Sequence, residues 1–158
     1  MTFYDHTLKL LEKDEGYHTY DAKNKLLSFY FTYFELLKVN RSFVVHTLTS
    51  QKTPLHNIKI LEHFRRKYME YITHVDIKLM DFKADKMEDA IRRGVHEISW
   101  TQFLFILKYW IKDTSKNFEQ TDILIEKSMN TGFEILNTSP LESILDLRKF
   151  VFQDKMKR

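Results

Sequence analysis

The sequence predicts a single all-helical domain, and three observations lead to this prediction. The chain of 158 residues contains only 3 Gly and 2 Pro. Helix interiors exclude both residues, whereas all-β folds need them at their turns. Hydrophobic residues make up 43% of the chain, which is enough for a core, and they recur at helical spacing. We therefore expect one all-α domain over residues 1–158, because no linker is long enough to divide it.

Two helices are expected before residue 40. Apolar side chains repeat at three- and four-residue spacing from Phe3 onward, and Gly16 is a typical C-terminal stop for that helix. Asp21 is a typical N-cap for the next helix, whose aromatic-rich face continues to Lys38. Asn40 interrupts this pattern and predicts the end of the second helix.

The next two helices begin at start signals. Arg41 opens a short apolar helix that continues through Leu48. Thr53 followed by Pro54 predicts a new start, because Thr caps a helix and Pro fits the first helical position. From there, apolar positions mark one face of a long helix that runs toward Met80.

A strongly apolar helix is expected in the last third of the chain. Residues 85–95 predict a polar helix, with a joint near Gly94 and Ser99, and residues 100–111 (WTQFLFILKYWI) are apolar on nearly every side. A helix packed on a domain needs only one apolar stripe. Exposing each large apolar side chain costs about 1.5–3 kcal/mol. Either this helix lies at the centre of the domain, or its outer face meets a partner subunit.

Two more helices are expected after it. Asn117 is a candidate N-cap for a helix over residues 118–136. Ser139 as cap and Pro140 at the first helical position predict a final helix over residues 141–152.

The sequence carries no enzyme signature. It has no Cys, which excludes disulfides, thiolate metal sites and a cysteine nucleophile. None of its 7 His belongs to a metal-binding motif, and we interpret Glu70 and His74 as a side-chain pair on one helix face. No phosphate-binding glycine loop or nucleophile elbow is present. We therefore expect no catalytic residue, no metal and no cofactor, and the lack of a signal peptide or apolar span predicts a cytoplasmic protein.

Aromatic content suggests a pocket. The chain has 13 Phe and 8 Tyr, and residues 29–34 place rings all round one helix. Such side chains can wall an apolar cavity or fill an ordinary core, and both interpretations remain open. The candidate ligand-binding residues are those on inward-facing positions of the expected helices, together with His63 at the edge of an apolar stripe: Phe31, Phe34, His63, Tyr68, Tyr71 and Phe103.

The order of elements resembles a known family. Residues 24–43 (NKLLSFYFTYFELLKVNRSF) are similar to the start of the C-terminal domain of TetR-type transcription regulators: an aromatic-rich helix, an Asn-Arg break and a short apolar helix. The long helix from Pro54 and the late helices at 100–112 and 118–136 match the rest of that domain in order.

The resemblance implies a homodimer, because the last two long helices of that family form a four-helix bundle with a second subunit. The residues expected in this interface come from both late helices: Trp100, Phe103, Leu107, Trp110, Ile123, Met129 and Phe133. The resemblance also implies that the pocket takes a small hydrophobic effector.

Two functions fit this resemblance. The first is the effector-binding and dimerisation domain of a TetR-like transcription regulator. DNA contact would then require a helix-turn-helix, for which there is no room ahead of Phe3, and Lys and Arg alternate with acidic residues rather than forming a basic face. The alternative is a TetR-fold lipid or isoprenoid carrier without DNA binding, for which residues 141–152 and the basic tail would be the membrane contact. We expect the first function, without membrane contact.

Overall fold

The computed structural model describes residues 2–49, 54–75, 77 and 85–137, and this part of the chain contains helices and no strand. The all-α prediction is therefore confirmed. The helices and their bounds are α1 (Phe3–Leu11), α2 (Ala22–Val39), α3 (Arg41–Thr49), α4 (Pro54–His74), α5 (Asp85–Lys112) and α6 (Glu119–Asn137), with short 3₁₀ turns at Tyr17–Thr19 and Lys116–Phe118.

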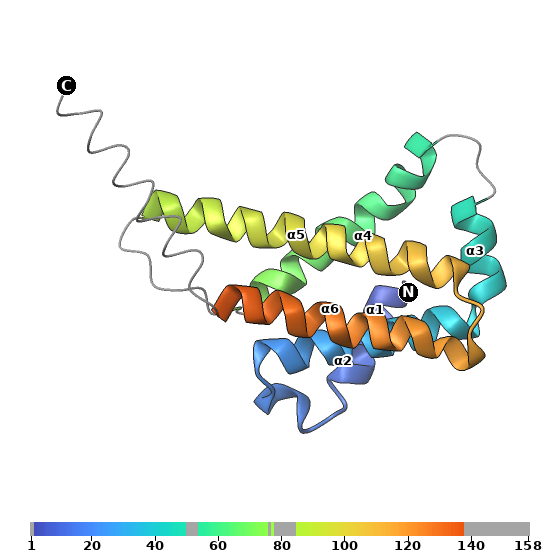
Figure 1. Cartoon of the computed structure of the whole chain (residues 1–158), viewed down its shortest axis with the longest axis horizontal. Helices are drawn as coiled ribbons and strands as arrows, with labels where there is room; N and C mark the ends of the chain where they lie inside the picture. Colours follow the sequence, from blue (N-terminus) through green and yellow to red (C-terminus); the bar gives the residue numbers. More distant parts are fainter. Residues whose placement is uncertain (1, 50–53, 76, 78–84, 138–158) are drawn as a thin grey trace.

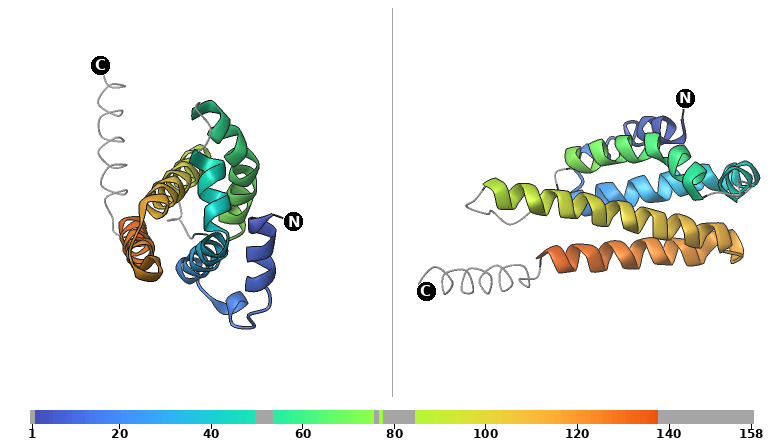
Figure 2. Two further views of the ribbon diagram at one scale, coloured as in Figure 1. Left: turned by 90° about the vertical axis from the view of Figure 1, so that its right-hand side faces the viewer. Right: turned by 90° about the horizontal axis from the view of Figure 1, so that it is seen from above.

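The long helices α5 and α6 lie side by side and run in opposite directions (Figure 1). Helices α1 to α4 all lie on one side of this pair, as the two views of Figure 2 show. Helix α2 packs against both α1 and α6, and α4 packs against α5. No described helix lies on the opposite side of the α5–α6 pair (Figure 2).

Four of the predicted start and stop signals are confirmed. The Asp21 carboxylate accepts a hydrogen bond of 2.8 Å from the Asn24 backbone N–H, so it caps α2 as expected. Asn40 ends α2, and α3 follows directly from Arg41. Pro54 is the first residue of α4. These positions were predictable because each depends on local backbone hydrogen bonding alone.

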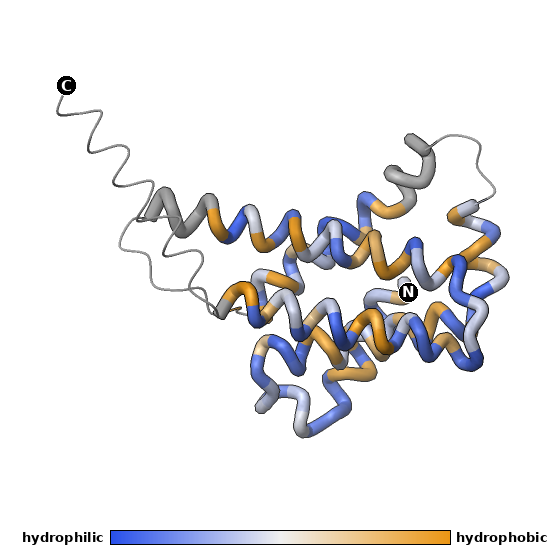
Figure 3. Tube along the Cα trace, viewed as in Figure 1, coloured by the Kyte–Doolittle hydropathy of each residue, from blue (hydrophilic) through white to orange (hydrophobic). Residues whose placement is uncertain are grey.

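The first predicted helix end is wrong. Helix α1 ends at Leu11 rather than at Gly16, and the N–H groups of Lys13 and Asp14 close it with tight turns. The segment between α1 and α2 is largely hydrophilic (Figure 3). A further turn of α1 would therefore have had no apolar face to bury, so the helix ends where its apolar pattern ends.

The predicted joint near Gly94 and Ser99 is also wrong, because α5 runs unbroken from Asp85 to Lys112. A single glycine inside a helix costs only about 1 kcal/mol relative to alanine. The packing of a 28-residue helix outweighs that cost.

Asn117 does not cap α6. Its backbone is left-handed, with φ of 54°, and the turn is organised by Asp113 instead. The buried Asp113 carboxylate accepts hydrogen bonds from the Ser115 N–H at 2.8 Å and from the Thr121 hydroxyl at 2.6 Å. Helix α4 ends at His74, short of the predicted Met80. The predicted final helix, 141–152, lies outside the described residues.

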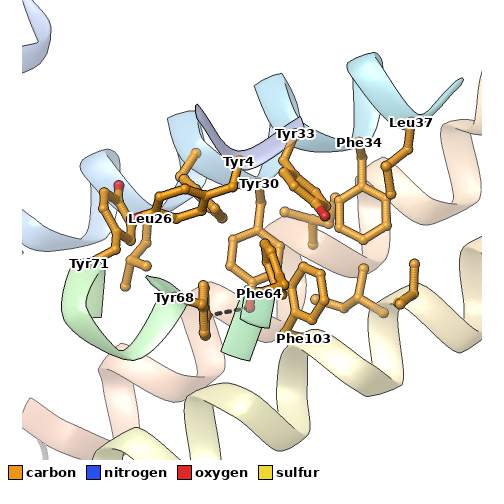
Figure 4. Close-up of a cluster of buried hydrophobic side chains, with 14 of the residues drawn as sticks. Tyr4, Leu26, Tyr30, Tyr33, Phe34, Leu37, Phe64, Tyr68, Tyr71 and Phe103 are labelled. Atoms are coloured by element: carbon orange, nitrogen blue, oxygen red, sulfur yellow. Dashed lines mark hydrogen bonds between the residues drawn. The ribbon is translucent and has the colours of Figure 1, made fainter. Parts of the chain in front are cut away.

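The core is a cluster of aromatic rings from α2, α4 and α5 (Figure 4). Phe103 of α5 lies at its centre, with ring centroids 4.6 Å from Phe64 and 5.4 Å from Tyr68. The Tyr30 and Tyr68 hydroxyls hydrogen-bond to each other at 2.8 Å, drawn as a dashed line in Figure 4. Ring packing and this buried pair hold the three helices at fixed positions.

Candidate ligand cavity and subunit face

An apolar cavity of about 210 Å³ lies between the start of α1, the second half of α2, α3 and α4. Much of its wall is aliphatic or aromatic: Leu37, Val44, Leu48, Leu61, Phe64 and Leu107. Apolar cavities of this kind stay dry and bind apolar molecules, as an engineered cavity of about 150 Å³ binds benzene. The cavity is therefore a candidate ligand site.

Helix α3 forms one wall of the cavity, and Arg41 fixes its position. The Arg41 guanidinium donates hydrogen bonds to the carbonyl oxygens of Ile111 at 3.1 Å and Asp113 at 3.2 Å. It also lies over the rings of Trp110 and Phe118, at 4.9 and 4.8 Å from their centroids. These contacts satisfy carbonyl groups at the end of α5, so α3 is tied to the turn between α5 and α6.

An ion pair lies beside the cavity at the start of α1. Lys67 of α4 donates a hydrogen bond of 2.5 Å to the Asp5 carboxylate, and Tyr4 donates one of 3.0 Å to the Lys67 carbonyl oxygen. The hydrogen bond from Lys67, followed by those from Thr2, lowers the pKa of Asp5 well below its usual range. Burial raises the pKa of Tyr4 to about 12. At neutral pH the pair is therefore Lys⁺ with Asp⁻, beside a neutral phenol.

The structure places the six predicted ligand-binding residues in two environments. His63 lines the cavity. The other five are in or against the aromatic core and do not line it: Phe34, Tyr68, Tyr71 and Phe103 are buried, and Phe31 is partly buried. Phe64 lies between the two environments, since it lines the cavity and contacts Phe103. The role of all six residues in ligand binding stays a prediction.

The α3 wall is the part of the cavity that the sequence interpretation missed. Val44, Thr47 and Leu48 all line the cavity, yet none was among the candidate residues. The sequence did contain an indication of this wall. A helix of only nine residues is not stable alone, so the apolar side chains of α3 must pack against another helix. Its direction after Asn40 could not be derived from the sequence, and that direction decides which residues it meets.

The α5–α6 pair exposes large apolar side chains on its outer side. Ile98, Phe105 and Tyr109 of α5 are 70%, 56% and 39% exposed, and their spacing of seven and four residues places them on one stripe. On α6, Ile135 and Ile123 are also exposed. We call the stripe of Ile98, Phe105 and Tyr109 the outer face. Exposed apolar groups that gather on one surface are typical of protein interfaces.

The structure separates the seven predicted interface residues into buried and accessible ones. The core of the chain itself covers four of them, and the other three are partly or fully accessible: Phe103, Leu107, Trp110 and Met129 are buried, Trp100 and Phe133 are partly buried, and Ile123 is exposed. Trp100 lies near Arg65 of α4, whose guanidinium is 5.9 Å from the indole ring. Whether any of the seven contacts a partner stays a prediction.

The described residues contain no group of three or more His, Cys, Asp or Glu that could hold a metal ion. Among the helices of this described part, none is long and apolar enough to cross a membrane.

The described helices therefore combine an apolar cavity with a pair of long antiparallel helices. Residues 25–151 match the family described as tetracyclin repressor-like, C-terminal domain, and the chain belongs to this family. The match confirms the TetR-type resemblance over most of the sequence. Neither the curated proteins nor the solved structures include a match to the chain.

Proposed function

We propose that this chain is the effector-binding and dimerisation domain of a TetR-like transcription regulator, acting in the cytoplasm without catalysis. The observation that carries this proposal is the apolar cavity of about 210 Å³, which residues of α1, α2, α3 and α4 line. Ligand sites are concave and mostly apolar, with a small number of polar groups that orient the ligand. The family membership supports a regulatory role for such a site.

The outer face supports dimerisation. Burying the three large apolar side chains of this stripe against a second copy would stabilise the pair by about 1.5–3 kcal/mol for each side chain fully removed from water. Ile98, Phe105 and Tyr109 follow one line along α5, so a second α5 could pack along it as in a helical bundle. In this proposal the partner meets the exposed neighbours of the predicted interface residues, together with Ile123.

Arg41 could couple ligand binding in the cavity to the arrangement of α5 and its outer face. A ligand that displaces Val44 or Leu48 would move α3, and Arg41 would transmit that movement to the end of α5. A ligand shifts an equilibrium between two shapes only if it binds one of them better. We propose that the ligand selects one position of α3, and with it one arrangement of the dimer that a DNA-binding segment can sense.

The ligand part of this proposal is tested by native mass spectrometry before and after denaturing extraction. We expect a dimer that carries a co-purified apolar molecule, or that takes up ethylbenzene when it is supplied. Leu48→Trp should fill the cavity and abolish uptake, whereas Val39→Trp, at an exposed position of α2, should not. Equal uptake by both variants would remove the cavity from the proposal.

The dimer part is tested by sedimentation equilibrium. Phe105→Glu should produce monomers because it places a charge in the centre of the outer face. Val39→Glu is the matched control, since Val39 is 81% exposed and lies on α2, away from that face. A monomeric wild-type protein at high concentration would contradict the dimer.

The coupling part is tested with Arg41→Met. This variant should still bind ethylbenzene but lose the ligand's effect on the dimer dissociation constant, because its contacts to Ile111 and Asp113 are gone. If the ligand changes the dimer dissociation constant of the variant as much as that of the wild type, Arg41 does not couple the two sites.

The same native mass spectrometry experiment distinguishes the regulatory domain from the alternative, a lipid or isoprenoid carrier. A cavity of about 210 Å³ is smaller than the roughly 300–1,000 Å³ of typical ligand pockets, so its size favours a small ligand over a long isoprenoid chain. Recovery of an isoprenoid from the purified protein would favour the carrier.

A further inference from the structure

One buried hydroxyl group beside the cavity has no partner. Tyr33 of α2 lines the cavity and is only 7% exposed, yet its hydroxyl makes no hydrogen bond to any residue that the structure describes. Figure 4 shows its ring between α2 and the rings of Phe64 and Phe103, at 5.0 and 5.7 Å between centroids. Burying an unbonded hydroxyl costs about 1–3 kcal/mol, so such groups need an explanation.

The other polar side chains of the described lining already have partners. The Tyr4 hydroxyl donates to the Lys67 carbonyl, the Thr47 hydroxyl donates to the Phe43 carbonyl at 2.8 Å, and the Thr2 hydroxyl accepts from the Asp5 N–H at 3.2 Å. Among the described lining residues, Tyr33 is therefore the one whose side-chain hydroxyl makes no hydrogen bond within the protein.

The charges of the described lining are also compensated. The Lys67 ammonium is paired with Asp5 at 2.5 Å. The Arg66 guanidinium lies 3.0 Å from Nδ1 of His63, so this side chain also has a partner. An anionic ligand would compete with Asp5 for the Lys67 ammonium, and the described lining offers no carboxylate to a cationic ligand. The lining therefore favours an uncharged molecule.

The phenol of Tyr33 is suited to donate a hydrogen bond. Burial raises the pKa of Tyr33 well above its usual value, so the group keeps its proton across the physiological range. Its unpaired O–H would meet an oxygen acceptor on a ligand in the same apolar surroundings, where hydrogen bonds are strong.

We propose that the cavity takes a small uncharged molecule with one hydrogen-bond-accepting oxygen, such as an aryl or short-chain alkyl ketone, and that Tyr33 donates to that oxygen. The volume of about 210 Å³ fits roughly eight or nine heavy atoms, since about 150 Å³ holds the six carbons of benzene. Tyr33 is then the specificity-determining residue. This inference rests on the proposed function, because it assigns the ligand class to the same cavity.

The test compares two neutral probes of similar shape, acetophenone and ethylbenzene, by isothermal titration calorimetry on wild type and Tyr33→Phe. Loss of one hydrogen bond should weaken acetophenone binding about five- to tenfold in the variant. Ethylbenzene affinity should stay unchanged, because it has no oxygen to accept the bond. Each probe is compared with itself across variants, so the different costs of removing the probes from water cancel.

Tyr4→Phe is the matched control. Tyr4 lines the same cavity, but its hydroxyl is already used by Lys67. This variant should leave the ratio of the two affinities as in wild type. A third probe, benzoate, tests charge, and it should bind more weakly than acetophenone to the wild-type protein.

The outcomes separate this inference from the proposed function. If neither acetophenone nor ethylbenzene binds, the cavity is not a ligand site for small apolar molecules and both proposals fail. If both bind but Tyr33→Phe changes neither affinity, only the assignment of Tyr33 is overturned. If benzoate binds most tightly and Lys67→Met abolishes that binding, the ligand is an anion and the neutral class is overturned.

Discussion

Buried tyrosines in the core and at the cavity differ in whether their hydroxyl groups have a hydrogen-bond partner. In the core, Tyr30 pairs with Tyr68 and Tyr17 with Tyr71, each through a hydrogen bond of 2.8 Å between hydroxyls. Tyr33 lies three residues beyond Tyr30 on the same helix, is similarly buried, and has no partner among the described residues. The comparison suggests that the core is organised for stability, whereas the cavity keeps one polar group ready for a ligand.

The largest effect should come from opening a second cavity in the core. Phe103→Ala should lower the free energy of unfolding by about 3–5 kcal/mol, because Phe103 is fully buried among aromatic rings. Leu48→Ala is the comparison at the existing cavity, and it should cost about 1–2 kcal/mol because Leu48 is only partly buried. Urea denaturation followed by circular dichroism measures both. Equal losses would mean that the cavity wall is packed as tightly as the core.

A smaller effect is expected from breaking one hydroxyl pair. Tyr30→Phe should lower the free energy of unfolding by about 1–2 kcal/mol, since it leaves the Tyr68 hydroxyl only its contact of 3.5 Å with the Ser99 carbonyl oxygen inside the core. The same denaturation experiment measures the loss. A neutral result would show that the paired hydroxyls do not contribute to stability, and the contrast with Tyr33 would disappear.

The ion pair beside the cavity should make stability depend on pH. The folded-state pKa of Asp5 is lowered from the usual 3.8, so its contribution is fully present above pH 3.8 and is lost as the pH falls below that value. Asp5→Asn should therefore flatten the decrease of Tm between about pH 4 and pH 2. The change should be modest, because Lys67 and Asp5 are both partly exposed. A decrease of equal steepness in the variant would assign the acid sensitivity to other carboxylates.

The smallest effect, and the most informative, is expected at Tyr33. Tyr33→Phe should leave the free energy of unfolding unchanged or raise it by up to about 1 kcal/mol, because it removes a buried hydroxyl that has no partner. Differential scanning calorimetry beside Tyr30→Phe measures the contrast directly. A loss as large as that of Tyr30→Phe would indicate that the Tyr33 hydroxyl is bonded in the free protein.

The helices were largely predictable from the sequence, because their signals are local. Asp21, Asn40 and Pro54 act through the backbone of the next few residues, and the structure places α2, α3 and α4 at these signals. The errors at Gly16 and Gly94 share one cause. A glycine was taken as a helix end, but helices end where apolar burial ends, and that depends on tertiary packing.

The cavity was less predictable than the helices. Aromatic residues at helical spacing are the same in a core and in a pocket wall, so the sequence could not distinguish Tyr33 from Tyr30. What distinguishes them is the presence of Tyr68 across from one and of open space beside the other. That difference arises from the crossing of α2 and α4, which no short-range pattern encodes.

The contact between Arg41 and Trp110 has a spectroscopic consequence. The chain contains only two tryptophans, and the emission of an indole changes when a cation near its ring moves. In a Trp100→Phe protein, Trp110 would be the sole emitter, located at the junction of α3 with the end of α5. The domain would then carry its own fluorescent reporter of α3 position, readable without a label in the same titrations that add ligand.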